Sequence, residues 1–491
     1  MTDQQDAQSI MDQVRVRFAP SPTGSLHIGN LRVAIFNYLF ARHHDGAFVV
    51  RIEDTDRERN VEGSLEGLLD DLRWAGLDWD EGPGVDGPFG PYRQSERGDN
   101  HRKAALSLEE RGLAYRCFCS DEELAQAARD DAPEPGCPGN CRSLEEGDIR
   151  ARMERDEPST LRFTVHPGTI TFRDAVRGDI SLEGSDLGDF VILRADGRAT
   201  YNFAVVVDDL EMKISHVIRG AGHLSNTPKQ ALLFDALDAP RPVFAHLPMV
   251  LGADKRKLSK REGAEGVVQL RSQGFHPDGV VNYLSLLGWS PGGDREILSR
   301  QELIAAMDLD RVGATDTVFD PEKLRWASAQ HIAALSLPEL VDAIRPWVDT
   351  ERFDLEARAL PAAVDAIRTR LTTFGEVNEH LSLIFPTEDA LQAGLQELER
   401  EGDSTLDTLK AIRTTLSSIE GWEAPELGSA VRSVGKDMGV RGRALFHPIR
   451  LAVTGSRQGP DLGKVLAALG RTRCIELLDG AILWLEKSEA V

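Results

Sequence analysis

Residues 14–53 read VRVRFAPSPTGSLHIGNLRVAIFNYLFARHHDGAFVVRIE and decide the fold of the first part of the chain. The opening VRVRFA predicts a short strand, and the turn-forming PSPTG segment ends it. Apolar residues then recur at the spacing of one helix face, at Ile28, Leu31, Ile35 and Leu39. We expect this helix to end near Gly46, before a buried strand in AFVVRIE. Strand, glycine-containing turn, helix and strand is the βαβ order of a doubly wound α/β domain.

The rest of the chain divides into a continuation of this domain and a helical half. Residues 60–76 and 96–112 have helical patterns, whereas 115–160 holds four cysteines and the loop-like DDAPEPGCPGN. A strand-rich piece with glycine turns continues to about 195, and α/β character resumes in FAVVVDD and SHVIRG. Beyond about 325 the pattern is almost wholly helical. The sequence therefore predicts an interrupted α/β domain followed by an all-α half.

Composition limits the class of protein. The chain has 491 residues, 41% of them hydrophobic, which is enough for several buried cores. Its longest apolar runs, such as Phe203 to Val207, reach five residues, and its N-terminus lacks the pattern of a secretory signal. We therefore expect a soluble cytoplasmic protein with no membrane partner. The net charge of −23 argues at first against nucleic acid as a partner, because phosphate binding depends on Lys and Arg.

The turn into the first helix is a candidate phosphate site. A helix N-terminus presents unpaired N–H groups and a positive dipole end. His27 can donate a hydrogen bond to a triphosphate oxygen there, and Gly29 lets a nucleotide approach the backbone. The alternative is that PSPTG is only a turn and His27 a surface cap. A lone H-x-G does not decide between the two.

A second candidate is the cationic segment that ends in Lys257-Leu-Ser-Lys-Arg261. Only 11 residues of the chain are lysine, and three of them lie at 255, 257 and 260. With Arg256 and Arg261 they place five cations within seven residues, beside the single anion Asp254. A basic loop can neutralise the charge that develops on a pyrophosphate leaving group. The alternative is a solvated charged loop.

Taken together, these two elements resemble the HIGH and KMSKS signatures of class I aminoacyl-tRNA synthetases. The segments RFAPSPTGSLHIGNLRVAIFNYLFAR, RIEDTDRER, GPYRQSER, YNFAVVVDD and HVIRG are similar to bacterial glutamyl-tRNA synthetases, and GRALFHPIRLAVTG resembles the C-terminal region of that family. The likeness covers nearly the whole chain. Asn30 departs from the second histidine of the HIGH signature, which leaves His27 and Gly29 as the expected phosphate contacts.

The resemblance implies a Rossmann-type class I catalytic domain with an inserted acceptor-binding domain, followed by an α-helical anticodon-binding domain. We place the first part of the catalytic domain at 1–95, the insertion at 96–195 and the second part at 196–235. A stem-contact region with the KLSKR loop would occupy 236–330, and the anticodon-binding domain 331–491.

The resemblance also implies a reaction. The enzyme would activate L-glutamate with ATP and Mg²⁺ to glutamyl-adenylate, then transfer the glutamyl group to the 3′ end of tRNA(Glu). His27, Lys257 and Lys260 are the expected catalytic residues. ATP binding is expected from the following set: His27, Gly29, Asn30, Ser259 and Lys260. We expect a monomer whose activation step usually requires bound tRNA.

Glutamate carries two carboxylates and an ammonium, so its pocket needs fixed cations and one acceptor. Arg17 and Arg219 can each offer a bidentate guanidinium, and we assign the side-chain carboxylate to Arg17 and the α-carboxylate to Arg219. Glu53 can accept from the ammonium, while Ser21 and Tyr201 add hydroxyl groups. These positions match the glutamate-binding residues of the family.

Four cysteines, Cys117, Cys119, Cys137 and Cys141, form a C-x-C-x17-C-x3-C pattern. Two close pairs across a loop fit a tetrahedral Zn²⁺ site, although C-x-C is tighter than the usual spacing. The alternative is a set of ordinary reduced thiols. Some family members hold zinc in this insertion, and we predict a structural zinc bound by all four thiolates. Cys474 lies in an apolar helical segment and is expected to be a core residue.

Several assignments stay open from the sequence. Asp208 and Asp209 could bind a metal, but capping or pairing with a nearby arginine is the favoured interpretation. The helical half offers possible RNA contacts at Arg413, Arg432, Arg441, Arg443 and Arg450.

Three related functions are disfavoured. A glutamyl-queuosine synthetase lacks the helical half, a glutaminyl-tRNA synthetase has a β-barrel there, and a catalytically dead paralogue would be expected to have lost His27 or Lys260. Charging of tRNA(Gln) as well as tRNA(Glu) remains an alternative.

Overall fold

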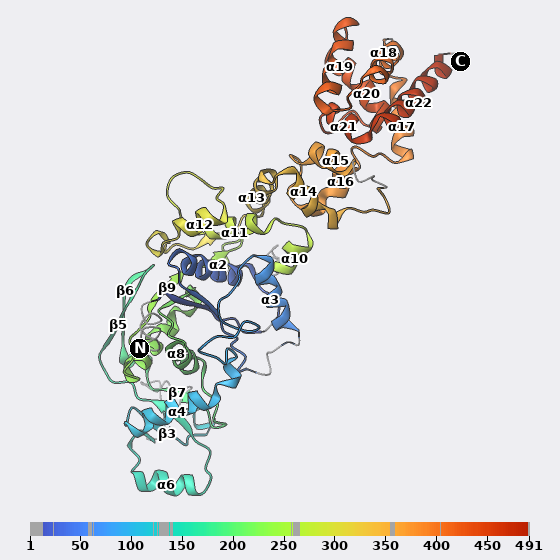
Figure 1. The fold of residues 1–491 in the computed structure, drawn as a ribbon. Coiled ribbons are helices and arrows are strands. Elements are labelled where there is room, and N and C mark those ends of the chain that lie inside the picture. The colour runs from blue at the N-terminus through green and yellow to red at the C-terminus, as the bar shows by residue number, and fades with distance from the viewer. Residues whose placement is uncertain are drawn as a thin grey trace, which may run out of the picture. The chain divides into compact units, whose positions relative to one another are not determined.

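The computed structural model describes residues 13–22, 24–56, 61, 63–120, 122–124, 126, 137, 141–256, 258, 266–353, 359–402 and 404–489. The chain forms two compact units. The first consists of Met1–Gln269 and Val281–Pro321, and the second of Leu270–Val280 and Glu322–Val491. Each unit has its own fold (Figure 1).

The first unit is a mixed α/β structure. Its strands are β1 (Arg15–Phe18), β2 (Ala47–Val50), β3 (Ala114–Cys117), β4 (Thr160–Phe163), β5 (Thr169–Asp174), β6 (Gly178–Glu183), β7 (Phe190–Leu193), β8 (His216–Gly220), β9 (Val243–Leu247), β10 (Val250–Leu251) and β11 (Thr317–Val318). Its helices are α2 (Ile28–His43), α3 (Ser64–Trp74), α4 (Gly98–Glu110), α6 (Glu146–Glu154), α7 (Gly184–Leu187), α8 (Tyr201–Glu211), α9 (Thr227–Ala236) and α12 (Arg300–Ala306). Helices α10 (Val267–Ser272) and α11 (Pro277–Leu286) span the boundary between the two units.

A six-stranded sheet in the order β2-β1-β8-β9-β5-β6 forms the centre of the first unit. All neighbouring pairs are parallel except the β5–β6 hairpin. Strand β1 has β2 on one side and β8 on the other, so the strand order reverses between β1 and β8. Ligands of open α/β sheets bind outside the carboxyl ends of the strands at such a reversal.

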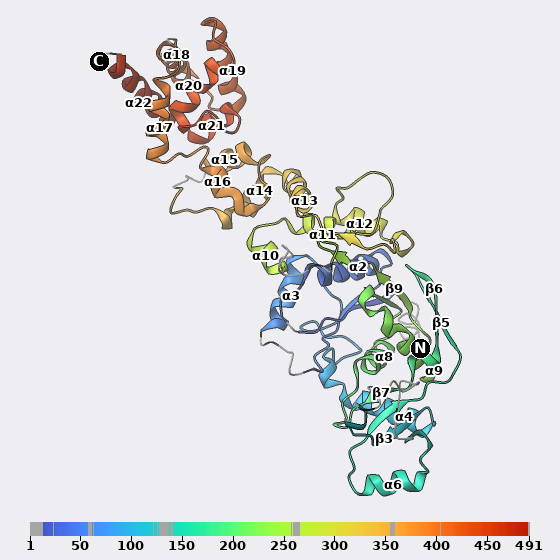
Figure 2. The ribbon, with the colours of Figure 1, turned by 180° about the vertical axis from the view of Figure 1, so that it is seen from behind.

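Helix α2 covers one face of the sheet and packs against β1, β2 and β8. The opposite face packs on α8 and α9, where Val49, Val217 and Phe244 share a core with Phe203 and Leu233. Figures 1 and 2 show α2 and α8 on opposite sides of the sheet.

Arg17 lies on the face of α8 and α9, since it pairs in register with Val49, a core residue of that face. Arg219 and His246, themselves a register pair, lie there too, two residues beyond Val217 and Phe244. Because successive side chains of a strand point to opposite faces, Arg17, Arg219 and His246 lie on the same face of the sheet near the strand ends.

A separate three-stranded sheet in the order β3-β4-β7 lies within the segment between α4 and α8, with antiparallel pairing throughout. Strands β10 and β11 pair in parallel as a two-stranded ribbon.

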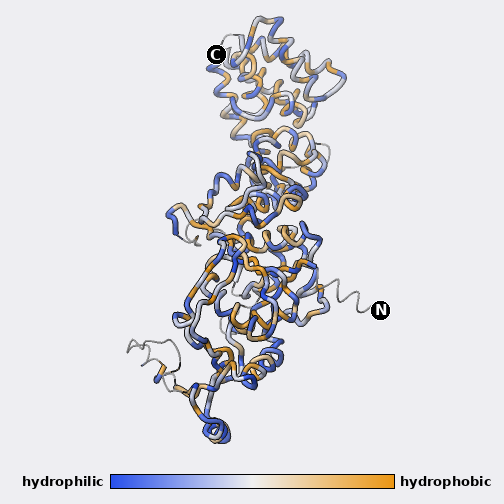
Figure 3. Tube along the Cα trace, turned by 90° about the vertical axis from the view of Figure 1, so that its left-hand side faces the viewer, coloured by the Kyte–Doolittle hydropathy of each residue, from blue (hydrophilic) through white to orange (hydrophobic). Residues whose placement is uncertain are grey.

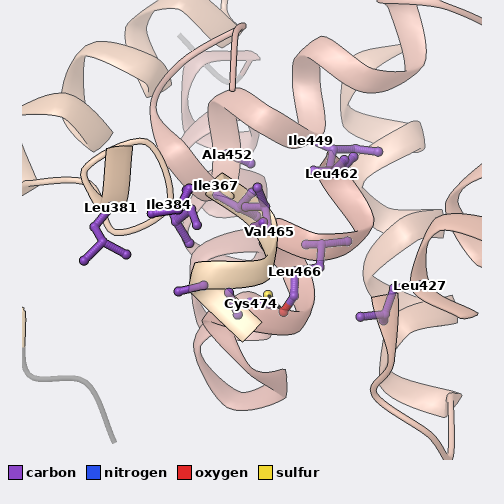
Figure 4. Packing of buried hydrophobic residues seen from close by; sticks show 14 of the residues in the cluster. Ile367, Leu381, Ile384, Leu427, Ile449, Ala452, Leu462, Val465, Leu466 and Cys474 are labelled. Carbon is purple, nitrogen blue, oxygen red and sulfur yellow. Dashed lines mark hydrogen bonds between the residues drawn. The ribbon is translucent and has the colours of Figure 1, made fainter. Parts of the chain in front are cut away.

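The second unit is helical over the residues that are described. It contains α13 (Pro321–Ala334), α14 (Leu337–Ile344), α15 (Ala359–Ile367), α16 (Val377–Leu381), α17 (Glu388–Leu398), α18 (Thr405–Ser418), α19 (Ala424–Asp437), α20 (Arg443–Thr454), α21 (Leu462–Leu469) and α22 (Arg471–Glu489), although α13 begins one residue inside the first unit. One hydrophobic cluster runs through these helices. Figure 4 shows Ile367, Val465, Leu466 and Cys474 gathered within it.

The expected fold class is confirmed. The predicted βαβ opening is present as β1, α2 and β2, and the helices expected in 60–76 and 96–112 are α3 and α4. The domain boundaries stay predictions. One detail differs from the expected organisation. Strands β5 and β6 fall within the expected insertion 96–195, yet they extend the central sheet, since β5 pairs in parallel with β9.

Hydrophobic and hydrophilic residues interleave along the chain (Figure 3). Among the described residues, no helix combines the length and the apolar character needed to cross a membrane.

We expect Leu466→Ala to lower the free energy of unfolding by about 2–5 kcal/mol, because Leu466 is wholly buried in the helical core and its truncation leaves a cavity. Leu483→Ala is the matched control, since Leu483 is 52% exposed and should change stability by less than about 0.5 kcal/mol. Scanning calorimetry of the full chain measures both variants. Equal effects would contradict the assignment of this core.

Candidate functional site

The site lies at the carboxyl ends of β1 and β8, where the strand order of the central sheet reverses. Arg17 near the end of β1 is 4% exposed, and its Nε donates to both carboxylate oxygens of Asp209, at 3.1 and 3.3 Å. Among the described residues, its two terminal nitrogens have no hydrogen-bond partner. Asp209 therefore fixes one edge of the guanidinium and leaves the other edge available to a ligand.

Arg51, just after β2, connects Asp209 to Glu53. Its Nη1 lies 2.5 Å from Oδ1 of Asp209 and its Nη2 lies 3.1 Å from Oε1 of Glu53. Burial alone would lower the pKa of Arg51, but the surrounding carboxylates Asp209, Asp208 and Glu53 raise it. Arg51 is therefore a permanent buried cation that holds two carboxylates in place.

Glu53 is buried beside these arginines. Burial raises the pKa of its carboxyl group, whereas the charges of Arg51 and Arg17 oppose that rise. Its backbone N–H donates to the carbonyl oxygen of Pro20 at 3.0 Å, which brings the exposed Ser21 next to the Glu53 backbone. Glu53 thus offers a hydrogen-bond acceptor just after β2, beside the end of β1 where the terminal nitrogens of Arg17 lie.

Tyr201 opens helix α8 and is 38% exposed. Its hydroxyl lies 3.1 Å from Nδ1 of His223. Desolvation and the charge of Glu53 raise the pKa of Tyr201 to about 12, so the phenol stays protonated near neutral pH. The positive charges of Arg219, Arg17 and Arg51 oppose this rise in the pKa of Tyr201.

Arg219 near the end of β8 is 5% exposed and has no salt bridge within the described residues. Its Nε and Nη2 donate to neutral acceptors on His246, Thr227 and Gln230. Its Nη1 is buried without a hydrogen-bond partner in the part of the chain that is described. Burial lowers the pKa of Arg219 to about 10, which still leaves it charged at neutral pH. A buried cation with an unpaired donor is suited to a ligand carboxylate.

The N-terminus of α2 is open. His27 is the exposed N-cap residue, and its carbonyl accepts the N–H of Leu31 at 2.9 Å. Gly29 and Asn30 in the first turn are exposed, and a Cβ placed on Gly29 would meet no atom within 4 Å. Packing within the described protein therefore gives no reason for a glycine at this position, which agrees with the expectation that a ligand approaches the backbone at this point.

Lys257, Ser259 and Lys260 lie outside the described residues. The segment that precedes them is a tight turn after β10, in which the N–H of Gly252 donates to the carbonyl of Arg256 at 2.8 Å and Lys255 has a φ of 61°. Arg32 of α2 ties the helix that begins after His27 to this region, since its Nη1 donates to the carbonyl of Pro248 at 2.7 Å.

Comparison with known proteins identifies the family of the chain. The family model for the catalytic domain of class I tRNA synthetases (E and Q) matches residues 13–326, and an anticodon binding domain model matches 339–482. The chain belongs to this synthetase family.

Relatives of similar length support the assignment. The glutamate–tRNA ligase of Desulforudis audaxviator is 42% identical over 97% of both chains. That of Carboxydothermus hydrogenoformans is also 42% identical, over 93% of this chain and 97% of the relative. A crystal structure of a glutamate tRNA ligase from Elizabethkingia meningosepticum, in complex with its amino acid, has a TM-score of 0.84 at 30% identity and covers 96% of this chain and 99% of its own.

Asp208 and Asp209 of this synthetase are ion-pair residues. Asp208 is fully buried and accepts from Nε of Arg97 at 2.6 Å, Nε2 of His101 at 2.7 Å and Nε2 of Gln94 at 2.8 Å. Burial would raise the pKa of Asp208, but the hydrogen bond from His101 and the charges of Arg51, His101 and Arg97 lower it. These contacts agree with pairing to arginine, the interpretation favoured from the sequence, and they occupy both carboxylates with protein donors.

The four cysteines Cys117, Cys119, Cys137 and Cys141 come together. Their sulfur atoms all lie within 4.8 Å of one another, with separations of 3.4 Å for Cys117–Cys137, 3.3 Å for Cys119–Cys137 and 3.7 Å for Cys119–Cys141. Four thiolates around a tetrahedral Zn²⁺ stand about 3.8 Å apart, given Zn–S bonds of about 2.3 Å. The donor set therefore fits zinc. Cys474 is a buried core residue as predicted, and its thiol donates to the carbonyl of Leu466 at 3.5 Å.

The arginines of the helical unit differ in availability. Arg413 pairs with Asp479 at 2.8 Å, and the half-buried Arg450 donates to the carbonyl of Pro460. Arg432, Arg441 and Arg443 are exposed. Of the five possible RNA contacts, these three have the guanidinium groups that the described structure leaves most accessible.

Sequence reasoning missed the residues that hold the site together. Arg51, His246, Thr227 and Gln230 contact the predicted pocket residues, and none of the four was among the predicted site residues. For Arg51 the usable signals were its place at the start of RIEDTDRER and the charge directly after the apolar strand AFVV. His246, Thr227 and Gln230 could not be connected to Arg219 without the pairing of β8 with β9 and the packing of α9.

We expect Asp208→Asn to destabilise the first unit by about 1.5–3 kcal/mol at pH 7, because Nε of Arg97 and Nε2 of His101 lose a buried charged acceptor, while Glu211 keeps its pairing with Nη2 of Arg97. Asp70→Asn is the control, since its ion pair with Arg73 is exposed and should contribute less than about 1 kcal/mol.

The stabilisation by Asp208 should also depend on pH. Its folded-state pKa is lowered, so the contribution is present above the unfolded-state pKa of about 3.9 and is lost as the pH falls through the folded value. Calorimetry of both variants across pH measures these effects. A wild-type stability for Asp208→Asn would show that its carboxylate does not hold the buried charge of Arg97.

Proposed function

We propose that this chain is a glutamate–tRNA ligase that activates L-glutamate with ATP and transfers it to tRNA(Glu). The observation that carries this proposal is the pair of buried arginines, Arg17 and Arg219, on neighbouring strands beside the buried acceptor Glu53. Both arginines have donors without a partner among the described residues. Two cations and one acceptor complement an amino acid with two carboxylates and one ammonium. The relatives named above are glutamate–tRNA ligases.

In this proposal Arg17 binds the side-chain carboxylate and Arg219 the α-carboxylate. Glu53 accepts from the ammonium, Ser21 adds a hydroxyl, and the protonated Tyr201 donates to a carboxylate. The buried pairing of Arg17 with Asp209 fixes the guanidinium before the substrate arrives. Such preorganisation lowers the ordering that binding would otherwise require.

ATP would lie with its phosphates at the N-terminus of α2. His27 donates to a phosphate oxygen, while Gly29 and Asn30 leave the backbone of the first turn accessible. Mg²⁺ bound with ATP neutralises phosphate charge. Lys257 and Lys260, with Ser259, stabilise the pyrophosphate as the α-carboxylate attacks the α-phosphorus. Catalysis then depends on positioning and charge stabilisation and needs no covalent intermediate with the protein.

The tRNA would contact both units. The segment that carries the four cysteines is proposed to meet the acceptor end, with a structural Zn²⁺ that orders it. The helical unit would bind the anticodon, with Arg432, Arg441 and Arg443 as the accessible cations. Charging of tRNA(Gln), a monomeric state and a cytoplasmic location stay predictions from the sequence.

Arg17→Ala should lower kcat/KM for glutamate about a hundredfold or more in ATP–pyrophosphate exchange with tRNA(Glu) present, because a ligand carboxylate loses a buried cation. The KM for ATP should change little. Arg73→Ala is the matched control, since Arg73 is exposed on α3. Unchanged glutamate kinetics for Arg17→Ala would remove Arg17 from the pocket and contradict the proposed mode of glutamate binding.

Zinc is tested by elemental analysis of protein purified without a chelator. We expect one zinc per wild-type chain, loss of zinc in Cys119→Ser, and retention in Cys474→Ser, because Cys474 lies apart in the helical core. No stoichiometric zinc in the wild type would contradict a metal role for these thiols and leave the synthetase assignment unaffected.

A further inference from the structure

A buried chain of hydrogen bonds stands behind Arg219. His246 of β9 is 0% exposed, and its Nδ1 lies 2.5 Å from Oδ2 of Asp174, the last residue of β5. On the other side of the ring, Nε2 lies 3.1 Å from Nε of Arg219 and 3.1 Å from the hydroxyl oxygen of Thr227. Asp174, His246 and Arg219 come from three adjacent strands, β5, β9 and β8.

These contacts fix the tautomer of His246. The Asp174 carboxylate can only accept, so Nδ1 carries the proton and donates to it. Nε2 then holds a lone pair, which is what the N–H of Arg219 and the hydroxyl of Thr227 require. The other carboxylate oxygen of Asp174 accepts the backbone N–H groups of Val176 at 3.0 Å and Arg177 at 2.9 Å, which fixes the orientation of the carboxylate.

These hydrogen bonds leave one donor nitrogen of Arg219 without an acceptor among the described residues. Nε is held by His246, and Nη2 donates to Thr227 at 2.9 Å and to Gln230 at 2.7 Å. Gln230 is itself held by its donation to Asn202 at 3.1 Å. Only Nη1 remains buried and unpartnered among the described residues, so the acceptors that surround the guanidinium determine which nitrogen is left for a ligand.

We propose that Asp174 and His246 are positioning residues for glutamate binding: the carboxylate holds His246 in the tautomer that accepts from Arg219, and this fixes Arg219 to bind a ligand carboxylate. The inference rests on the proposed function, since the ligand carboxylate is that of glutamate. It adds to the pocket two residues that are not expected to touch the substrate.

The arrangement makes glutamate binding sensitive to pH. Burial and the charges of Arg219 and Arg177 lower the pKa of His246, whereas Asp174 raises it, and the net shift is downward. Thr227 and Gln230, which face the group from α9, are uncharged. Protonation in acid would remove the lone pair at Nε2 and place two cations in contact. Because the pKa of His246 is lowered, the KM for glutamate should rise only on the acid side of the ordinary histidine value of about 6.5 and stay level above it.

Three variants separate positioning from a general structural role. In Asp174→Asn, the oxygen can keep the two backbone N–H bonds, so the amide NH₂ faces Nδ1 of His246. His246 must then accept at Nδ1 and carry its proton on Nε2, opposite the N–H of Arg219. His246→Leu removes the acceptor altogether. His246→Gln can place its carbonyl oxygen near the position of Nε2 and cannot be protonated in this pH range.

The experiment measures KM for glutamate and for ATP in pyrophosphate exchange with tRNA(Glu), from pH 5.5 to 8, together with the melting temperature. We expect Asp174→Asn and His246→Leu to raise the KM for glutamate about tenfold or more, while that for ATP stays within about twofold. His246→Gln should restore most of the affinity and lack the rise in KM on the acid side.

Several outcomes would overturn the inference. They are a wild-type KM for glutamate in Asp174→Asn, an equal rise in both KM values with a lowered melting temperature, and an acid-side rise that persists in His246→Gln. A wild-type enzyme that activates no glutamate at any pH would contradict the proposed function as well. Wild-type activation with an unaltered Asp174→Asn would contradict this inference alone.

Discussion

Two adjacent carboxylates on α8, Asp208 and Asp209, hold the first unit together at its site. Successive residues of a helix point about 100° apart, so the two side chains can reach different elements. Asp209 binds Arg17 and Arg51 at the ends of β1 and β2, whereas Asp208 binds Arg97 and the helix α4 through His101. Buried ion pairs thereby join the ends of β1 and β2 to α8, and α8 to the start of α4. A buried charge of this kind that loses its partner carries a large desolvation penalty.

The same constraint explains which cations remain available. In a chain of net charge −23, most arginines can find a carboxylate, and Arg15, Arg51 and Arg97 do so. Arg219 instead is surrounded by neutral acceptors and keeps its charge uncompensated. The acidic composition does not exclude anionic substrates. A cation that binds such a substrate needs donors that the protein's own carboxylates do not occupy: Arg17 pairs with Asp209 through Nε alone, and the acceptors of Arg219 are neutral.

Much of the fold was predictable because it depends on local patterns. The βαβ opening follows from apolar spacing and turn residues between 14 and 53, and the helical half from long periodic segments. The run FAVVVDD shows where intrinsic propensity fails to predict the local structure. Three consecutive valines favour a strand by propensity, yet Val205, Val206 and Val207 lie inside α8, because burial against the sheet outweighs the small intrinsic preference.

The sequence by itself determined the residue types of the predicted pocket, through motifs at Arg17, His27, Glu53 and Arg219, and those of the predicted zinc site, through the spacing of four cysteines. The tertiary structure decided how those residues are held. Asp209 reaches Arg17 across 192 positions, and Asp174 reaches His246 across 72. Contacts of this kind arise from strand order and helix packing, so no local pattern encodes them. They fix which nitrogens of Arg17 and Arg219 remain unpaired among the described residues, because the fold places acceptors beside Nε of Arg17 and beside Nε and Nη2 of Arg219 but none beside the others.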